Sequence, residues 1–345
     1  MTGPGVAMAA EIAETPAVLA RLGETASTWD DALRRSATGV HGVALTARGS
    51  SDHAAAYGRY LLEQALGVPA WSTAPSLITR YASSAREDNL LAIAVSQSGC
   101  TPEIVAVLEH ARAHGARTVA VTNDVGSPLA DAADVVVPLM AGREVAVPST
   151  KTFTASIAAF AYIARATDTT GQFGFADEPL SHCVAELLDD SNGLDEAVGA
   201  LVDAPAVIHL GRGYLLPLAR EGALKFIEAV RFPNMAWSPV DFLHGPFAMV
   251  RPGTCVIIHH ADGPVAPDTE AIARRLIEAG SIVISIGQPL TGTAVHIHAH
   301  SSTLGEHLQP VLHAVRVQQL ALALALARDI DPDRPPGLDK VTATT

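Results

Sequence analysis

Residues 91–103 read LAIAVSQSGCTPE and contain the feature that decides the fold. A short apolar run, Leu91–Val95, leads into a loop of small polar residues, and Thr101 and Pro102 follow. A continuous apolar run predicts a strand that is covered on both faces, as in a parallel sheet. Thr and Pro in this order are typical of a helix N-cap and first turn. The stretch therefore predicts a buried strand followed at once by a helix, which is the repeating unit of α/β proteins.

The same alternation of apolar runs and Ala- and Leu-rich helical stretches extends over most of the chain. The spacing between the first four expected strands resembles the spacing between the last four. This repetition predicts an α/β fold with two similar α/β/α sandwiches in tandem and mainly parallel sheets, although doubly wound proteins can show such spacings by chance. The expected strands are Val43–Ala47, Leu90–Val95, Thr118–Thr122, Val135–Val137, Ala206–Leu210, Cys255–His259, Ile282–Ile286 and Val295–Ala299.

Composition shifts predict four segments along the chain. Residues 1–35 are expected to form an N-terminal helical arm. Residues 36–175 and 192–330 are expected to form the two sandwiches, with a polar, glycine-containing stretch near the boundary. The tail, 331–345, returns to apolar and specific residues after two prolines, which favours a docked tail over a frayed one.

The composition argues against several classes of function. The chain has 345 residues, of which 48% are hydrophobic and 17% charged, and a formal net charge of −13. Nucleic-acid partners need a basic surface, so none is expected. No apolar run reaches the length of a membrane span and the N-terminus lacks the features of a secretory signal, so no membrane partner is expected. Three widely spaced cysteines, Cys100, Cys183 and Cys255, argue against a disulfide framework and favour a cytoplasmic location.

The loop after Val95 is a candidate phosphate site. It brings hydroxyl groups and free backbone N–H groups to the N-terminus of the expected helix, where an anion is stabilised. The lysine of a nucleoside triphosphate loop is missing, so a phosphate monoester fits better. An ordinary capped turn would explain the same residues. The candidate ligands are Ser96, Gln97, Ser98 and Thr101.

Two further polar turns lie at expected helix starts, and the first of them could face the same crevice as the Ser96–Ser98 loop. Ser50 and Ser51 follow the first expected strand, and ligands of open α/β sheets bind beyond the carboxyl ends of the strands. Val147, Pro148 and Ser149 form the second turn, in which Pro148 is expected to start a helix. Each turn is also explained by a simple helix cap.

The second half carries residues suited to acid–base chemistry. Glu221, Lys225 and Glu228 fall on one face of a predicted helix, either as a surface salt-bridge row or as part of a site. The helix follows a strand end, where sites gather, which favours the second interpretation. His244 precedes Gly-Pro and is therefore expected on a turn, where it could carry a proton near neutral pH.

Clustered histidines raise the possibility of a metal site. His259 and His260 are adjacent on a strand and point to opposite faces. His296, His298 and His300 share one face and could bind zinc, but no Cys, Asp or Glu is interleaved. A strand-edge or interface role is the more common one for such a row, so no metal is expected.

Seven motifs in order resemble those of the sugar isomerase (SIS) domain family. The likeness covers nearly the whole chain and is greatest to the isomerase half of glucosamine-6-phosphate synthase and to the related stand-alone glucosamine-6-phosphate deaminases. After an M-x-x-E-I-x-E-x-P opening at Met8, the motifs are Gly49-Ser50-Ser51, Ser96-Gln97-Ser98-Gly99-x-Thr101, Val147-x-Ser149-Thr150-Lys151, Gly211-Arg212-Gly213, Glu221-Gly222-Ala223-Leu224-Lys225-x-x-Glu228, His244-Gly245-Pro246 and Lys340-Val341-Thr342.

The resemblance implies roles for the matching residues. Glu228 would move a proton between C1 and C2 of the sugar, with Lys225 beside it. His244 would help to open the sugar ring and would come from the partner subunit of a homodimer. Lys340 would reach the crevice, where the synthases form an imine with the ketose. The sugar phosphate would be held by Ser96, Gln97, Ser98 and Thr101, with further substrate contacts from Ser50, Ser51, Val147 and Ser149.

The resemblance therefore implies an enzyme without a cofactor that converts glucosamine 6-phosphate to fructose 6-phosphate and ammonia. Aldose–ketose chemistry needs a proton-shuttling base, a ring-opening acid or base and phosphate-binding donors, and these need no metal or redox cofactor. Another hexosamine or fructosamine phosphate, a synthase-like isomerase without glutaminase, and a non-catalytic sugar-phosphate sensor remain alternatives. No glutaminase domain is expected ahead of the first strand. Cys100, Ile227 and Asp241 replace family residues, which leaves the exact sugar open.

Overall fold

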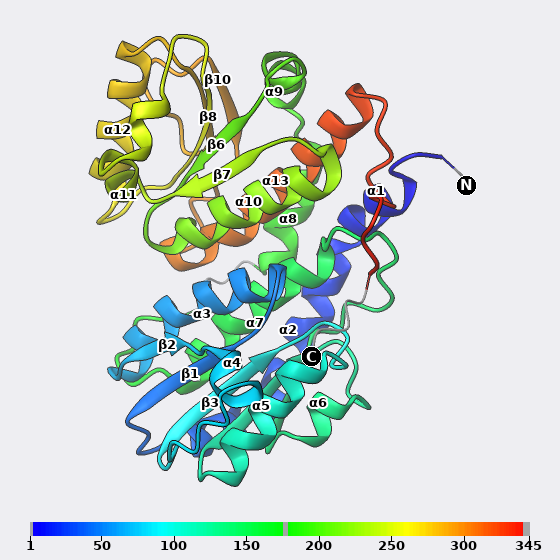
Figure 1. The fold of residues 1–345 in the computed structure, drawn as a ribbon, viewed down its shortest axis with the longest axis vertical. Helices are drawn as coiled ribbons and strands as arrows, with labels where there is room; N and C mark the ends of the chain where they lie inside the picture. The colour runs from blue at the N-terminus through cyan, green and yellow to red at the C-terminus, as the bar shows by residue number, and fades with distance from the viewer. Residues whose placement is uncertain (1–2, 175–178, 341–345) are drawn as a thin grey trace. The chain divides into compact units, whose positions relative to one another are not determined.

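The computed structural model of the protein describes residues 3–174 and 179–340 (Figure 1). Val341 and Thr342 of the tail motif lie outside the described residues. The chain forms two compact units, each built on one sheet. The first-sheet unit comprises Ala17–Glu144, Lys151–Phe175 and Asp339–Thr345, and the second-sheet unit comprises Met1–Pro16, Val145–Thr150 and Ala176–Leu338.

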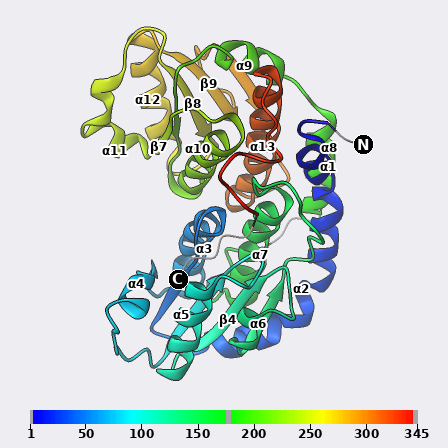
Figure 2. The ribbon, with the colours of Figure 1, turned by 45° about the vertical axis from the view of Figure 1, so that its right-hand side comes forward.

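The first-sheet unit contains a five-stranded parallel sheet in the order β2-β1-β3-β4-β5. Helix α3 packs on β1 and β2 and lies along α7, whereas α5 packs on β3 and β4 (Figure 2). The strands are β1 (Gly42–Thr46), β2 (Ala70–Ser72), β3 (Leu90–Val95), β4 (Arg117–Thr122) and β5 (Val135–Pro138). The helices are α2 (Thr15–Ala37), α3 (Ser50–Leu66), α4 (Pro75–Thr79), α5 (Pro102–Ala113), α6 (Pro128–Asp131) and α7 (Lys151–Thr167).

The second-sheet unit repeats this topology. Its five parallel strands have the order β10-β9-β8-β6-β7, which matches the first sheet strand for strand when it is read from the other edge. The strands are β6 (Val207–Leu210), β7 (Asn234–Trp237), β8 (Cys255–His260), β9 (Ile282–Gly287) and β10 (Val295–His298). The helices are α1 (Val6–Ala13), α8 (Leu180–Asp189), α9 (Leu194–Leu201), α10 (Leu216–Val230), α11 (Pro239–Leu243), α12 (Ala266–Glu278) and α13 (Gln309–Ala327), with short 3₁₀ turns η1 (Gly213–Leu215), η2 (Pro246–Met249) and η3 (Glu306–Leu308).

The predicted tandem of α/β sandwiches is confirmed, and all eight expected strands are present within a residue or two of their expected ends. Strands β2 and β7 were not expected. Each is a short edge strand, and Trp71 and Trp237 are 39% and 38% exposed. A half-exposed edge strand needs no continuous apolar run, and therefore leaves no such signal in the sequence.

The expectation that Pro148 starts a helix is wrong, because α7 begins at Lys151. The preceding segment is held by hydrogen bonds of its backbone instead of turning into a helix. The Glu11 carboxylate accepts from the backbone N–H of Val145 and of Ala146, and Gln318 Nε2 donates to the Thr150 carbonyl oxygen at 3.1 Å.

Helix α13 is the core helix of the second-sheet unit. Together with η3 it forms a helix long and apolar enough to cross a membrane, with a mean hydropathy of 1.4 over an 18-residue window. However, 72% of that window is buried within the protein, and α13 packs on α10 and β9. Its Arg316 is fully buried and donates to the carbonyl oxygens of His298 and Asp190, both at 2.6 Å. These contacts are those of a globular core.

Three fully buried histidines lie in the core of the second-sheet unit. His209 of β6 stacks on His259 of β8 at a ring-centroid distance of 6.0 Å, and His259 lies 5.6 Å from His313 of α13. Burial lowers the pKa of all three rings, that of His259 to about 3. Repulsion from neighbouring histidines, which acts when the rings are protonated, lowers the pKa of His209 and His313 further. All three are therefore neutral in the folded protein at neutral pH.

This histidine cluster predicts that the protein loses stability in mild acid. In the unfolded chain each ring has a pKa near 6.5, so below that pH the unfolded state binds protons that the folded state cannot. The free energy of unfolding should fall by about 2–3 kcal/mol between pH 8 and pH 6, and urea titrations at the two pH values measure it. His209→Leu should reduce the pH-dependent part by about a third. Equal stability at both pH values would contradict the prediction.

Candidate active site

The first candidate group lies at the carboxyl ends of β1 and β3. These strands are neighbours, and the chain continues from β1 to β2 on one side and from β3 to β4 on the other. Ligands of open α/β sheets bind at such a point, where the strand order reverses. The turn 47–49 follows β1 and the loop 96–101 follows β3, so the two sequence-predicted turns share one edge of the sheet.

The loop 96–101 is held in place by its backbone. The backbone N–H of Ser96 donates to the Val121 carbonyl oxygen, while the Gly99 carbonyl oxygen accepts from Leu129, both at 3.1 Å. Gly99 has a φ of 63°, and a Cβ there would lie 2.0 Å from Ser127 Oγ, so no other residue fits. These contacts define the shape of the loop in the structure.

The polar side chains of this loop surround the N-terminus of α5. Ser96 Oγ accepts from the Gly99 N–H and Ser98 Oγ accepts from the Cys100 N–H, both at 3.2 Å. Thr101 occupies the predicted N-cap position, but in the described residues its hydroxyl makes no capping bond and lies 3.5 Å from Ser96 Oγ. Hydroxyl donors and helix N–H groups at one place can bind an oxyanion.

The turn after β1 brings a second helix N-terminus to this edge. Gly49 has a φ of 57° and a ψ of −137°, which turns the chain directly into α3. Ser50 and Ser51 are therefore the first two residues of α3, and both are half-buried. The sequence prediction for this turn correctly places the two hydroxyls at a helix start.

Lys340 of the tail lies in the same unit as this loop. Its side chain is only 19% exposed, and Nζ lies 2.5 Å from Oε2 of the fully buried Glu144. Glu144 also accepts from the backbone N–H of Thr152 at 3.1 Å and from its hydroxyl at 2.7 Å. Burial alone would raise the pKa of Glu144, but Lys340 and the Thr152 hydrogen bonds hold it below its usual range.

The second candidate group lies on α10. Lys225 is fully buried, and its Nζ is 3.4 Å from Glu221 Oε1 and forms a close ion pair with Glu228 Oε2. Glu221 is 2% exposed, whereas the side chain of Glu228 is 19% exposed. The interpretation as a surface salt-bridge row is therefore wrong. A buried lysine holds two carboxylates, of which Glu228 is the one that a small molecule can reach.

His244 lies on the turn after α11, as predicted, and it is exposed. Leu243 and Met249 beside it are also exposed. Val147 and Ser149 belong to the second-sheet unit, where the Val147 N–H donates to the Asp333 carbonyl oxygen at 3.0 Å. Both residues are half-buried.

The predicted site residues thus form two groups. Within the first-sheet unit, the structure brings Ser50 and Ser51 to the same sheet edge as Ser96, Gln97, Ser98 and Thr101, and Lys340 belongs to this unit. The second-sheet unit carries Lys225, Glu228, His244, Val147 and Ser149. Sequence reasoning missed Glu144, because a single Glu without a periodic partner gives no signal. It also missed the ion pair of Arg48 with Glu103, in which Arg48 Nη2 lies 2.8 Å from Glu103 Oε2.

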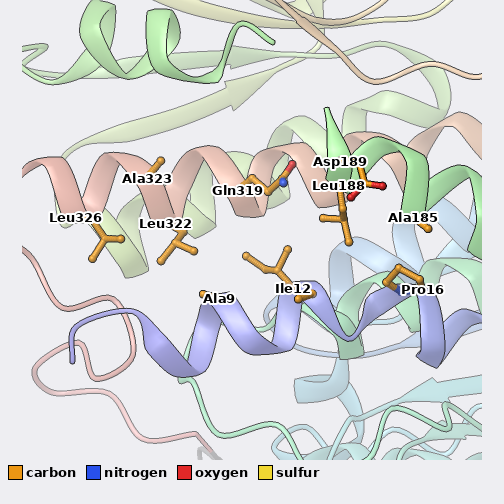
Figure 3. A pocket seen from close by; sticks show the side chains of 11 residues that line it. Ala9, Ile12, Pro16, Ala185, Leu188, Asp189, Gln319, Leu322, Ala323 and Leu326 are labelled. Carbon is orange, nitrogen blue, oxygen red and sulfur yellow. The ribbon is translucent and has the colours of Figure 1, made fainter. Parts of the chain in front are cut away.

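Neither the histidine row nor a large pocket adds a further site. Within the described ranges, no group of three or more His, Cys, Asp or Glu side chains could hold a metal ion, and His296 Nδ1 lies 3.0 Å from Ser285 Oγ. An open pocket of about 660 Å³ lies among α1, α8 and α13 of the second-sheet unit (Figure 3). Its lining is mostly apolar and includes none of the predicted site residues.

Comparison with known proteins identifies the family. The SIS domain profile matches residues 39–166. A crystal structure of a candidate phosphosugar isomerase from Silicibacter pomeroyi DSS-3 is 31% identical, covers 95% of this chain and 99% of its own, and superposes with a TM-score of 0.86. The chain belongs to the SIS domain family. The resemblance drawn from the seven motifs is thereby confirmed.

Two further SIS relatives extend this likeness. The glutamine–fructose-6-phosphate aminotransferase (isomerizing) of Methanothermobacter thermautotrophicus is 29% identical over 339 residues, which cover 96% of this chain and 56% of that protein. The chain spans about half the length of the curated relatives it matches. A crystal structure of glucosamine-6-phosphate deaminase from Thermotoga maritima, 23% identical, covers 98% of this chain and all of its own with a TM-score of 0.74, and shows the same fold.

Proposed function

We propose that this SIS protein is a phosphosugar isomerase that acts on an amino sugar and converts glucosamine 6-phosphate and water to fructose 6-phosphate and ammonia. One observation carries the proposal. Glu228 presents a partly exposed carboxylate on the rigid helix α10, and its position is fixed by the fully buried Lys225. A carboxylate that is held in place and can be reached is the base that an aldose–ketose interconversion needs.

The reaction needs one proton moved between adjacent carbons. In the open-chain sugar, Glu228 takes the proton from C2, and the electron pair of the broken C–H bond forms the C1–C2 double bond. The π pair of the C1=O bond moves to O1, which takes a proton from water, and the product is an enolamine. The same carboxyl group returns the proton to C1, which leaves an iminium group at C2. Water then adds at C2 and ammonia leaves, which gives the ketone of fructose 6-phosphate. Atoms and electrons balance without a redox partner.

Other residues have supporting roles in this proposal. Ser96, Gln97, Ser98 and Thr101 bind the phosphate at the N-terminus of α5. His244 assists ring opening, and the exposed apolar neighbours of this histidine support a homodimer in which it serves the partner subunit. Sedimentation experiments that measure the mass of the protein in solution test this proposal, and the mass of two chains is expected. Lys340 lies beside the buried Glu144 at the end of the tail, and its ammonium group contributes a contact to the anionic substrate in this proposal.

The names of the relatives support this chemistry. They include a candidate phosphosugar isomerase, an isomerizing aminotransferase for fructose 6-phosphate and a glucosamine-6-phosphate deaminase. Ammonia release measured over a panel of glucosamine 6-phosphate, galactosamine 6-phosphate, fructosamine 6-phosphate and unphosphorylated glucosamine tests the proposal. The highest kcat/KM is expected for glucosamine 6-phosphate. A preference for the unphosphorylated sugar would overturn it.

The phosphate role of the loop predicts the effect of Ser98→Ala. Loss of one hydroxyl donor to a charged ligand should weaken binding of fructose 6-phosphate by about 1–3 kcal/mol. Calorimetric titration measures this, and Cys100→Ala, an exposed change in the same loop, should leave the affinity unchanged. Unphosphorylated fructose serves as the second ligand. An equal loss for both ligands would show that Ser98 only supports the shape of the loop.

The position of Lys340 predicts a loss of activity when its charge is removed. Lys340→Met should lower kcat/KM at least tenfold, because one charge-assisted bond to an anionic substrate contributes more than about 1.4 kcal/mol. Steady-state kinetics measure the change. The exposed Leu338 lies in the same tail, and Leu338→Ala should leave the kinetics unchanged. Unaltered kinetics of the Lys340 variant would remove the tail from the mechanism.

A further inference from the structure

An ion pair joins the two turns of the candidate phosphate site. Arg48 lies in the turn after β1. Its Nε donates to Glu103 Oε2 at 3.0 Å, and its Nη2 lies 2.8 Å from the same oxygen. Glu103 is in the first turn of α5, and its side chain is only 10% exposed. Thr79 of α4 lies 3.5 Å from its other oxygen. The carboxylate therefore lies at the helix end where phosphate is proposed to bind.

The second-sheet unit contains the same ion pair. Arg212 lies two residues after the end of β6, as Arg48 lies two residues after the end of β1. Asp268 lies eight residues after the end of β8, as Glu103 lies eight residues after the end of β3. Arg212 Nε donates to Asp268 Oδ2 at 3.0 Å, the distance found in the first-sheet unit. The internal repeat thus preserves a bond between the two turns at the point where the strand order reverses.

The two copies differ in what surrounds them. The loop after β8 has none of the paired serines of the loop after β3, and Arg212 Nη1 donates to Ser238 Oγ at 3.2 Å. Asp268 is 41% exposed, whereas Glu103 is nearly buried. In both copies, therefore, the ion pair connects the two turns and has a structural role. Any effect on phosphate is confined to the first copy.

We propose that Arg48 is a positioning residue for phosphate binding that acts through Glu103, by masking this carboxylate at the N-terminus of α5. A sugar phosphate carries a charge of about −1.5 to −2 at neutral pH. An acid in the first turn stabilises a helix in the absence of ligand but repels such an anion. With Arg48 paired to Glu103, the acid keeps its structural role and the net charge at the binding loop is not negative. This inference rests on the proposed phosphate role of the loop.

Four variants separate masking from structure and from direct contact. The probe is glucitol 6-phosphate, which has no carbonyl group and cannot be isomerised, and its Kd is measured by calorimetry. Arg48→Met should raise the Kd at least tenfold, because the unmasked carboxylate interacts with the phosphate charge at short range. Arg48→Met combined with Glu103→Gln should recover most of the loss. Arg48→Lys should stay within a few fold of wild type, and Arg212→Met, the matched control, within twofold.

The outcomes are distinguishable. Recovery in the double variant, with an unaffected Arg212→Met protein, supports the masking role, since a structural loss would not be repaired by a second substitution. An equally weak double variant would overturn it and would show that Arg48 itself contacts the phosphate. A loss in Arg212→Met as large as that in Arg48→Met would overturn it in favour of a structural role. Wild-type protein that does not bind glucitol 6-phosphate would overturn the proposed function together with this inference.

Discussion

Glu228→Gln is expected to abolish ammonia release while leaving sugar-phosphate binding nearly intact. The amide keeps the shape of the side chain and can still accept from Lys225, but it cannot take a proton from carbon. General base catalysis contributes a factor of about 10²–10⁴ to the rate. The kcat of the variant should therefore be lower than that of the wild type by at least a factor of about 10². Kinetics under saturating substrate and a calorimetric Kd for glucitol 6-phosphate measure the two effects separately.

A conservative substitution provides the control for this experiment. Glu228→Asp retains a carboxylate but withdraws it by one methylene group, so kcat should lie between those of the wild type and the Gln variant. If Glu228→Gln retained more than half of the wild-type turnover, another group would be the base. The role that the family resemblance gives to this position would then not apply to this chain.

Lys225→Met should produce the largest loss of stability of any single change considered for this protein. Lys225 is fully buried and pairs with both Glu221 and Glu228, so its replacement removes the cation that the two carboxylates share. Removing one partner of a buried ion pair costs about 3–5 kcal/mol. The free energy of unfolding from urea titration at pH 8, where the core histidines do not titrate, should fall by this amount.

An exposed ion pair with similar spacing is the matched control. Arg274 and Glu270 of α12 are also four residues apart, but their side chains are 65% and 50% exposed and 3.9 Å separates their charged atoms. Arg274→Met should change the free energy of unfolding by less than about 0.5 kcal/mol. A Lys225→Met protein that lost no more stability than this control would contradict a stabilising buried ion triad.

The sequence predicted the parts of the fold that depend on local pattern. Leu90–Val95 is a buried apolar run and was placed without error, because a strand covered on both faces must be apolar throughout. Thr101 and Pro102 likewise fixed the start of α5. The edge strands β2 and β7 are not predicted from the sequence, because their half-exposed residues form no continuous apolar run.

The candidate site was predictable only where a motif marks it. The Ser96–Thr101 loop and the Glu221–Lys225–Glu228 row are local in sequence, so their spacing is visible. Glu144 and Lys340 are 196 residues apart, and neither lies in a periodic pattern that would pair them. Lys225 and Glu221 are buried because α10 packs against α13 and the sheet. The local sequence pattern does not encode this packing, so it could not distinguish a buried ion triad from a surface row.

The central claim is that the chain moves a proton from C2 to C1 of an amino-sugar phosphate and releases the nitrogen. Ammonia and fructose 6-phosphate, measured in the same reaction from glucosamine 6-phosphate, test it most directly. Wild-type protein should release one ammonia for each fructose 6-phosphate formed, and the Glu228→Gln protein should form neither product above background. Interconversion of sugar phosphates without ammonia, or equal product formation by both proteins, would contradict it.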